Sequence, residues 1–382
     1  MFFDRLFRFF TSLKLTVVLL VLAMVLVFIG TLAQVELGLY EVQSRFFQSF
    51  FVLWGPAGAG WEIPVFPGGY LIGGLLLINL SVSIFRVAFT VKKVGILIIH
   101  AGLILLLLGQ LATDQLAREG LLHMRKGESK SFSESDRLSE LVIMDVTEPT
   151  HASVVAIPDS LLASRGTFNV PGMPFRVKVR RFLPNAQLAQ RSSEGFERSP
   201  GTAGLGSNVW FREIPRAAKM EERNLPAAII ELEKAGGPVL GTLLVSGQLE
   251  KMQRLSADGR HYEFALRLRR YYKPFSLELL EFRHDVYRGT DTPKNFSSLV
   301  RLNNSQSGEK REVKIYMNNP LRYGGFTFYQ SGFDRDNQGT ILQVVRNPSW
   351  MTPYIACLIV GAGLTIQFLS HLIPFLKRRL IP

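Results

Sequence analysis

The stretch from Val94 to Ala112 constrains this chain most, because it is almost entirely apolar and contains one ionisable residue, His100. At about 1.5 Å per residue, a helix of these residues is roughly 28 Å long, which matches a hydrocarbon core of about 30 Å. Gly95, Gly102 and Gly109 recur every seven residues and therefore line one side of that helix. The sequence predicts a membrane span that another backbone approaches closely along its glycines.

His100 lies about 160° around the predicted helix from the glycines. An imidazole inside hydrocarbon is costly unless it has a partner, so an intramembrane histidine indicates a functional site by default. The competing interpretation is a packing residue that hydrogen-bonds a carbonyl of another helix. From this residue alone, both interpretations stay open.

Three further apolar runs are candidate spans, at about residues 15–33, 70–89 and 351–373. Basic residues in short flanks mark the cytoplasmic side of a membrane. Here they lie before the first span, between the second and third, and after the fourth: Arg5, Arg8, Lys14, Arg86, Lys92, Lys93, Lys377, Arg378 and Arg379. This pattern predicts that both termini are cytoplasmic and that Thr113 to Ser349 is extracytoplasmic. Thr31–Ala33 resembles a signal-peptide cleavage site, but its apolar run is long for a signal peptide, which favours an anchor.

The segment from Thr113 to Ser349 has a different pattern, in which apolar and polar residues alternate over many short runs. Tyr262, Phe264 and Leu266, for example, alternate with Glu263 and other residues, and a period of two is typical of half-buried strands. Many such runs separated by Gly, Pro and Asn predict an antiparallel sandwich or a partly open barrel. Residues 185–224 are rich in Arg, Ser, Gly and Glu, so we expect a loop or disordered insert there.

The predicted fold class is therefore a membrane protein with four transmembrane α-helices, three plus one, and a large antiparallel β-rich extracytoplasmic domain. Residues 1–112 would hold three spans, at about 15–33, 70–89 and 94–112. Residues 113–349 would form the β-rich domain, and 350–382 the fourth span with a short basic tail. The aromatic and basic first ten residues suit a lipid surface.

Composition argues against several kinds of chemistry. The chain has a formal net charge of +13, 47% hydrophobic residues and one cysteine, Cys357, which falls inside an apolar run. One cysteine cannot form a disulfide framework or a CxxC pair. The outer histidines lack metal-ligand spacing, and no serine-hydrolase, zinc-protease or P-loop motif occurs. We expect no catalytic residue, and no nucleic-acid partner for a domain that faces away from the cytoplasm.

Two tracts carry a resemblance to a known family. They are DTPKNFSSLVRL, Asp291–Leu302, and KIYMNNPLRYGGFTFYQSGFD, Lys314–Asp334. Both resemble the hallmark C-terminal region of the ResB (CcsB) family of cytochrome c biogenesis proteins, and the three N-terminal spans agree with that family. We expect the second tract to be structural, as a strand, a turn and a strand, because Asn318, Gly324 and Gly325 are turn residues between β-rich runs.

The resemblance implies haem handling beside a ResC (CcsA) partner in the bacterial inner (plasma) membrane. The complex would carry haem b across the membrane and present it to the CxxCH sites of apocytochrome c. The family's transmembrane histidine, a proposed axial ligand of haem iron, carries over to His100. The partner family's tryptophan-rich motif does not occur here, which implies an unfused subunit that is non-catalytic by itself and part of a haem-lyase complex.

Haem chemistry is compatible with this assignment, because neutral imidazole is a common axial ligand. His100 lies six residues, roughly 9 Å, inside the predicted cytoplasmic end of its helix. Arg86, Lys92 and Lys93 at that end are candidate partners for the propionates, although topology alone would explain them.

The second axial ligand is expected from the partner. His371 is the other histidine near membrane depth in this chain, and the basic residues after it favour an interfacial position. Two alternatives stay open: a membrane-tethered apocytochrome chaperone or scaffold that does not ligate haem, and an envelope sensor or transporter accessory.

Overall fold

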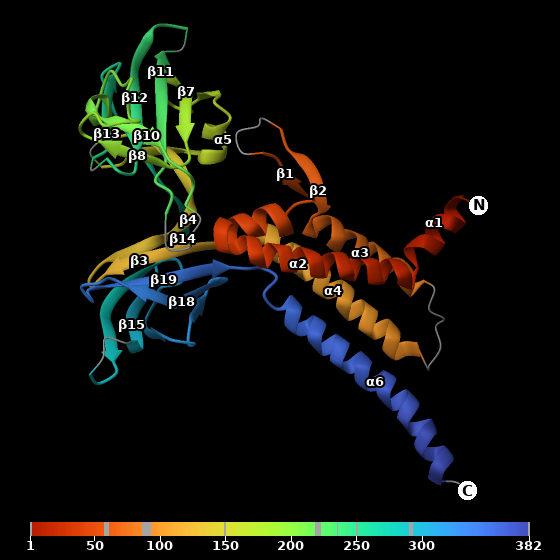
Figure 1. Cartoon of the computed structure of the whole chain (residues 1–382). Coiled ribbons are helices and arrows are strands. Elements are labelled where there is room, and N and C mark those ends of the chain that lie inside the picture. Colours follow the sequence, from red (N-terminus) through yellow and green to blue (C-terminus); the bar gives the residue numbers. More distant parts are fainter. Residues whose placement is uncertain are drawn as a thin grey trace. The chain divides into compact units, whose positions relative to one another are not determined.

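A computed structural model describes residues 2–56, 61–85, 93–148, 150–217, 223–234, 236–249, 251–289 and 293–380, with the side chains of all of these except 293 and 380. The chain divides into two compact units (Figure 1). The helical unit is formed by Met1–Arg118 and Arg346–Pro382, and the β-rich unit by Glu119–Ala217 and Glu221–Val345.

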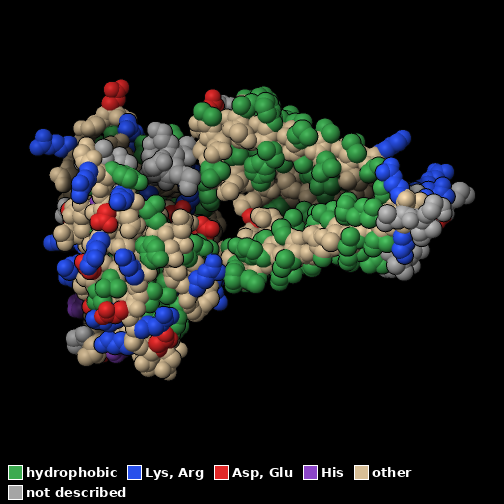
Figure 2. Space-filling model, turned by 90° about the horizontal axis from the view of Figure 1, so that it is seen from below, with side chains coloured by type: hydrophobic (Ala, Val, Ile, Leu, Met, Phe, Trp, Pro, Cys, Tyr) green, Lys and Arg blue, Asp and Glu red, His purple; other side chains and the backbone are tan. Residues whose placement is uncertain are grey.

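Helices formed by apolar runs make up most of the helical unit. They are α1 (Phe2–Phe10), α2 (Leu13–Val42), a π-helix (Gln43–Phe47), α3 (Gly69–Ile84), α4 (Val94–Leu116) and α6 (Thr352–Leu380). The hairpin of β1 (Phe51–Trp54) and β2 (Ile63–Pro67) lies between the π-helix and α3 in the chain. The helix surfaces are largely hydrophobic, and Lys and Arg side chains gather at the end where α6 finishes (Figure 2).

Within the described residues, three helical stretches are long and apolar enough to cross a membrane: Leu13–Phe47, Val94–Leu116 and Thr352–Arg379. The predicted span at 70–89 corresponds to α3, a shorter apolar helix of 16 residues that ends at Ile84. Residues 86–89 of that predicted span lie outside the described residues. The described part of the chain therefore supports three spans by length, and the fourth stays a prediction.

The glycine side of α4 packs against α6. Gly95, Gly102 and Gly109 are the buried residues of α4. A Cβ placed on Gly102 would lie 2.6 Å from Cγ2 of Val360, and the same atom on Gly109 would collide with Thr352. The predicted close approach along the glycines is confirmed, and the two helices run antiparallel.

Among its described residues, the β-rich unit has two large hydrophobic cores, joined by its two longest strands, β4 (Ser129–Asp145) and β14 (Arg260–Val286), and a smaller third core. In the first region, the sheet β12-β11-β7-β6 packs against the parts of β4 and β14 near Ile143 and Phe264. Its elements are β5 (Ser153–Pro158), α5 (Asp159–Ala163), β6 (Thr167–Asn169), β7 (Phe175–Leu183), β11 (Ala227–Lys234), β12 (Val239–Ser246) and β13 (Gln253–Ala257).

The second region is a curled antiparallel sheet with the strand order β16-β15-β14-β4-β3-β19-β18-β17. Leu277, Val300, Phe328 and Leu342 are among the residues of its core. Its further strands are β3 (Arg118–Arg125), β15 (Pro293–Asn304), β16 (Glu309–Tyr316), β17 (Leu321–Tyr323), β18 (Phe326–Phe333) and β19 (Gly339–Arg346). The predicted large antiparallel β-rich domain is confirmed.

The predicted loop or disordered insert at 185–224 is wrong in part, because the segment contains three short strands and a helical turn. It forms β8 (Ala186–Ala189), β9 (Glu197–Arg198) and β10 (Trp210–Glu213), which pair as a three-stranded sheet, with a 3-10 turn at Leu205–Asn208. Phe211 is 1% exposed because it packs with Ala186 and Ile229 in a third core. The segment folds because it covers the second face of β11, where every residue from Ala227 to Leu232 is buried.

The tract Lys314–Asp334 forms the end of β16, then β17 and β18. Asn318, Gly324 and Gly325 adopt φ values of 63°, 57° and 79°, which their residue types tolerate. The predicted strand, turn and strand is confirmed, with the short strand β17 added between the two turns.

Candidate functional site

His100 is the seventh residue of α4, and its side chain is half-buried. Its Nδ1 lies 2.8 Å from the backbone carbonyl oxygen of Ile96, one turn earlier in the same helix. Because a carbonyl can only accept, Nδ1 carries the proton of the neutral ring, and Nε2 then holds a lone pair. A metal-ligating histidine uses the same arrangement, in which one ring nitrogen donates a hydrogen bond that fixes the tautomer and the other faces the metal.

The side of α4 opposite the glycines carries His100, so α6 occupies the other face. Nε2 of His100 makes no hydrogen bond within the described residues. The packing interpretation requires a hydrogen bond from His100 to a carbonyl of a neighbouring helix. The hydrogen bond that His100 makes lies within its own helix instead. Within the described residues, Nε2 of His100 is therefore available to a ligand, on a helix that is mostly apolar.

His371 lies on α6, and its Nε2 is 2.8 Å from Nε2 of Gln367. Gln367 in turn lies beside Gly95, while Val360 lies beside Gly102. Gly363 lies against Ile99, the neighbour of His100, and eight residues, roughly 12 Å along a helix, separate Gly363 from His371. The structure therefore does not bring His371 to the level of His100.

The predicted propionate partners are only partly described. Lys93 lies immediately before α4, at the helix end nearest His100. Arg86 and Lys92 lie outside the described residues. Of the basic residues suggested for this role, Lys93 alone has a described position.

Two polar contacts fix the helices around α4, and one of them is not evident from the sequence. Asp114, at the far end of α4, accepts hydrogen bonds from Nε2 of Gln48 at 2.5 Å and from the hydroxyl of Tyr70. Gln115 donates to the same tyrosine oxygen at 2.8 Å. The signal that could have indicated this contact is an acidic residue directly after an apolar run. These bonds hold the π-helix and α3 against the end of α4.

Asn79 of α3 makes the second contact and is 1% exposed. Its Oδ1 accepts from Oγ1 of Thr16 at 2.7 Å, and its Nδ2 donates to the carbonyl of Phe10 at 2.6 Å. This buried asparagine is therefore hydrogen-bonded between helices. It joins α3, a neighbour of α4, to the junction of α1 and α2.

The histidines of the β-rich unit occupy separate positions. His123 contacts Asp334 at 2.9 Å, and His284 Nδ1 lies 3.0 Å from Oδ1 of Asn337. Within the described residues, no three His, Cys, Asp or Glu side chains gather as a metal site. Among those same residues, His100 and His371 lie on helices long enough to span a membrane, and each has one ring nitrogen without a hydrogen bond.

The chain is similar to known proteins over its β-rich part and beyond. Residues 243–345 match the ResB-like family. The chain carries a ResB-like domain. That domain runs from within β12 to β19 and includes both tracts on which the resemblance rests, so the resemblance to the ResB family is confirmed.

Two curated relatives extend the similarity. Protein NrfI of Wolinella succinogenes is 26% identical over 302 residues, which cover 78% of this chain and 30% of that protein. Cytochrome c biogenesis protein Ccs1 of Pyropia yezoensis is 28% identical over 108 residues, 27% of this chain and 23% of that protein. The matched part of this chain thus covers about a third or less of the length of each of these relatives.

Proposed function

We propose that this chain acts in cytochrome c maturation, as a membrane subunit that holds haem on its way to apocytochrome c. The ResB-like domain and the similarity to Ccs1, whose name assigns it to cytochrome c biogenesis, support this role. The observation that carries the haem part is the state of His100, with Nδ1 bonded to Ile96 and Nε2 uncommitted.

The described residues around His100 fit a haem b. An apolar macrocycle requires an apolar helix face, and α4 offers one whose buried residues are only the glycines that meet α6. Haem bound here would supply an iron that needs imidazole nitrogen, and His100 Nε2 would provide it. Lys93, at the end of the same helix, would neutralise a propionate that reaches the membrane surface.

The other axial ligand would come from a ResC/CcsA-type partner. His371 is about two helical turns away from the level of His100 along α6, so one chain does not supply both ligands at one depth. In this proposal both termini are cytoplasmic and the β-rich unit is extracytoplasmic, where it would meet apocytochrome c. The bond-forming activity would belong to the complex.

The test is His100→Gly in the complex purified with its partner, followed by the visible spectrum and by cytochrome c maturation in cells. The variant should lose the six-coordinate haem spectrum and maturation, and added imidazole should restore both because it fills the vacated position. His371→Gly is the matched control and should retain both. Wild-type haem content in His100→Gly would contradict the proposal and favour the chaperone or scaffold role.

Orientation has its own test. A reporter fused after residue 382 should read cytoplasmic, and one inserted near residue 192 should read extracytoplasmic, because the basic flanks lie on one side of the predicted spans. The reverse pattern would contradict the proposed orientation and, with it, the proposal that haem is carried out of the cytoplasm.

A further inference from the structure

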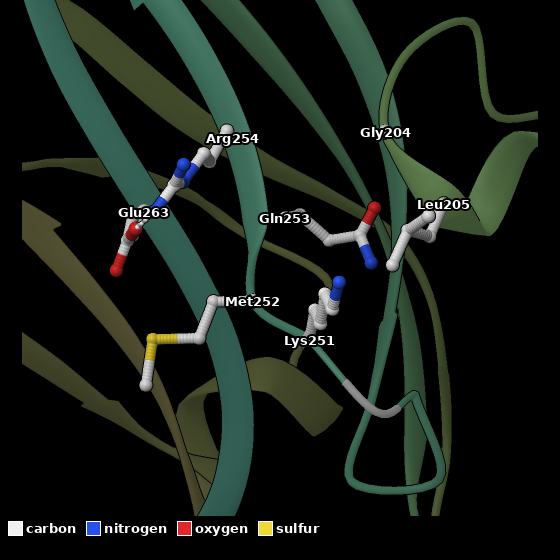
Figure 3. A pocket seen from close by; sticks show the side chains of 7 residues that line it. All are labelled: Gly204, Leu205, Lys251, Met252, Gln253, Arg254 and Glu263. Carbon is white, nitrogen blue, oxygen red and sulfur yellow. Dashed lines mark hydrogen bonds and ion pairs between the residues drawn. The ribbon is translucent and has the colours of Figure 1, made fainter.

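A cavity of about 640 Å³ opens in the β-rich unit (Figure 3). The turn Gly204–Leu205 forms one wall, and the segment Lys251–Arg254, which leads into β13, forms another with Glu263 of β14. Its volume lies in the range of about 300–1,000 Å³ typical of small-molecule sites. The second wall belongs to the ResB-like domain, and the first precedes it in the chain.

Gln253 is the buried polar residue of this cavity, at 2% exposure. Its Oε1 accepts a hydrogen bond from the backbone N–H of Gly206 at 3.1 Å. Its Nε2 is buried and has no hydrogen-bond partner within the described residues. Buried amide donors are nearly always paired in native proteins, and this unpaired one belongs to a residue that lines the cavity, so a ligand acceptor would complete it.

The direction of the amide is fixed by its surroundings. A reversed amide would place its NH₂ group against the N–H of Gly206, so two donors would face each other. Gly204 adopts a φ of 72°, and a Cβ there would collide with Oε1 of Gln253. The turn is therefore shaped around the amide oxygen, and Figure 3 shows the nitrogen on the opposite side, toward Lys251 and Leu205.

The other lining side chains add a positive charge and apolar surface. Arg254 is neutralised by Glu263, with 2.7 Å between Nη2 and Oε1. Lys251 is exposed and forms no ion pair with a carboxylate of the described residues. Leu205 and Met252 are 52% and 43% exposed, which is high for large apolar side chains beside a cavity. The lining thus combines an unpaired donor, a positive charge and uncovered apolar surface.

We propose that this cavity binds a small amphipathic carboxylate, whose carboxylate oxygens accept from Nε2 of Gln253 and from the ammonium of Lys251 while its apolar body lies on Leu205 and Met252. An acceptor-rich anion satisfies the donor that the protein leaves unpaired, and charge-assisted hydrogen bonds are the stronger kind. The site does not rest on the role of His100.

The test measures binding to the full chain in detergent by calorimetry and by ligand-observed NMR. The first probe is phenylbutyrate, with neutral phenylbutyramide as its uncharged match. The second is metal-free deuteroporphyrin, a flat dicarboxylate followed by its fluorescence. Gln253→Glu keeps the acceptor for Gly206 but replaces the donor by a negative oxygen, and Lys251→Met removes the charge at similar length. Each should weaken carboxylate binding about tenfold or more, since charged hydrogen bonds have that effect.

The matched controls are Gln187→Glu on the exposed strand β8 and Lys310→Met on the exposed edge of β16, neither of which lines the cavity. They also correct for partition of probes into micelles, which is equal in all variants. A loss confined to Gln253 and Lys251 variants supports the site, and the probe that shows it identifies the source as an alkyl carboxylate or a porphyrin propionate. No binding of either probe, or equal affinity in wild type and both cavity variants, would overturn the proposal.

Discussion

The two units handle buried polar groups differently. In the β-rich unit, charged side chains pair across neighbouring strands, as in Arg180 with Glu231 at 2.6 Å and Arg267 with Glu140 at 3.1 Å. In the helical unit, the fully buried Asn79 is instead satisfied by a hydroxyl and backbone carbonyls. A strand always has a neighbour in register that can supply a counter-charge, whereas an apolar helix has few polar neighbours.

The difference shows which groups need an explanation. A paired arginine of the sheet is ordinary, while a polar group without a full set of partners stands out in either unit. Lys273 is such a group in the β-rich unit, and His100 is one in the helical unit. For Lys273 the consequence is a lowered pKa, and for His100 it is the proposed ligand role.

Lys273 should give the largest effect on stability. It is 8% exposed, donates to Oγ of Ser133 at 2.8 Å, and burial lowers its pKa from 10.5 to about 8. Between pH 8 and pH 10.5 the folded chain holds fewer protons at this site than the unfolded chain. The free energy of unfolding should therefore rise across that window, by about 3 kcal/mol at most, and stay lowered below pH 8.

The measurement is denaturant unfolding of the β-rich unit in the full chain, followed from pH 7 to pH 11. Lys273→Met should remove this rise, and Lys310→Met, on an exposed strand edge, should leave it in place. An identical pH profile in wild type and Lys273→Met would show that the sheet compensates this charge as it does the others.

The glycine side of α4 should give the next largest effect. Gly102→Val places its side chain within 2.6 Å of Val360 and 3.1 Å of the carbonyl of Ala356, so α4 and α6 must separate. We expect a loss of about 2 kcal/mol, typical of overpacking. Thermal unfolding in detergent measures it, with Gly361→Val as control because nothing lies within 4 Å of a Cβ there. Equal melting temperatures for the two variants would refute the close packing.

Asn79→Ala should cost somewhat less, about 1–2 kcal/mol. It removes the acceptor of Thr16 and the donor to Phe10, and both of those groups are half-buried. Thr16→Val tests the same bond from the other side and should overlap with it, so the double variant should lose less than the sum of the two. Full additivity in that cycle would mean that the hydrogen bond does not join α2 to α3.

His100→Ala should have the smallest effect on stability, below about 0.5 kcal/mol. Its described hydrogen bond lies within its own helix, and alanine favours helix formation. The haem-free chain should therefore melt as wild type does, while haem binding is lost. A loss of stability as large as that of Asn79→Ala would instead indicate that His100, like Asn79, is a packing residue.

Periodicity and local composition are enough to predict the long apolar helices, the glycine side of α4 and the β-rich segment. Gly95, Gly102 and Gly109 recur with a period that only a helix face explains, and alternation around Phe264 has the period of a strand. The tracts at 291–302 and 314–334 carry the resemblance to the ResB family in their residues alone. These features are local or periodic, and therefore visible in one chain.

Which groups meet depends on the folded chain. Composition suggests disorder at 185–224, yet Phe211 is buried because β11 needs cover on its second face. The spacing of the glycines does not identify α6 as the helix that packs against α4. Nothing local to Gln253 places it beside the turn at Gly204–Gly206. Whether a polar group is satisfied depends on atoms distant in sequence, so the spare nitrogen of His100 and the unpaired amide of Gln253 are visible only in the tertiary structure.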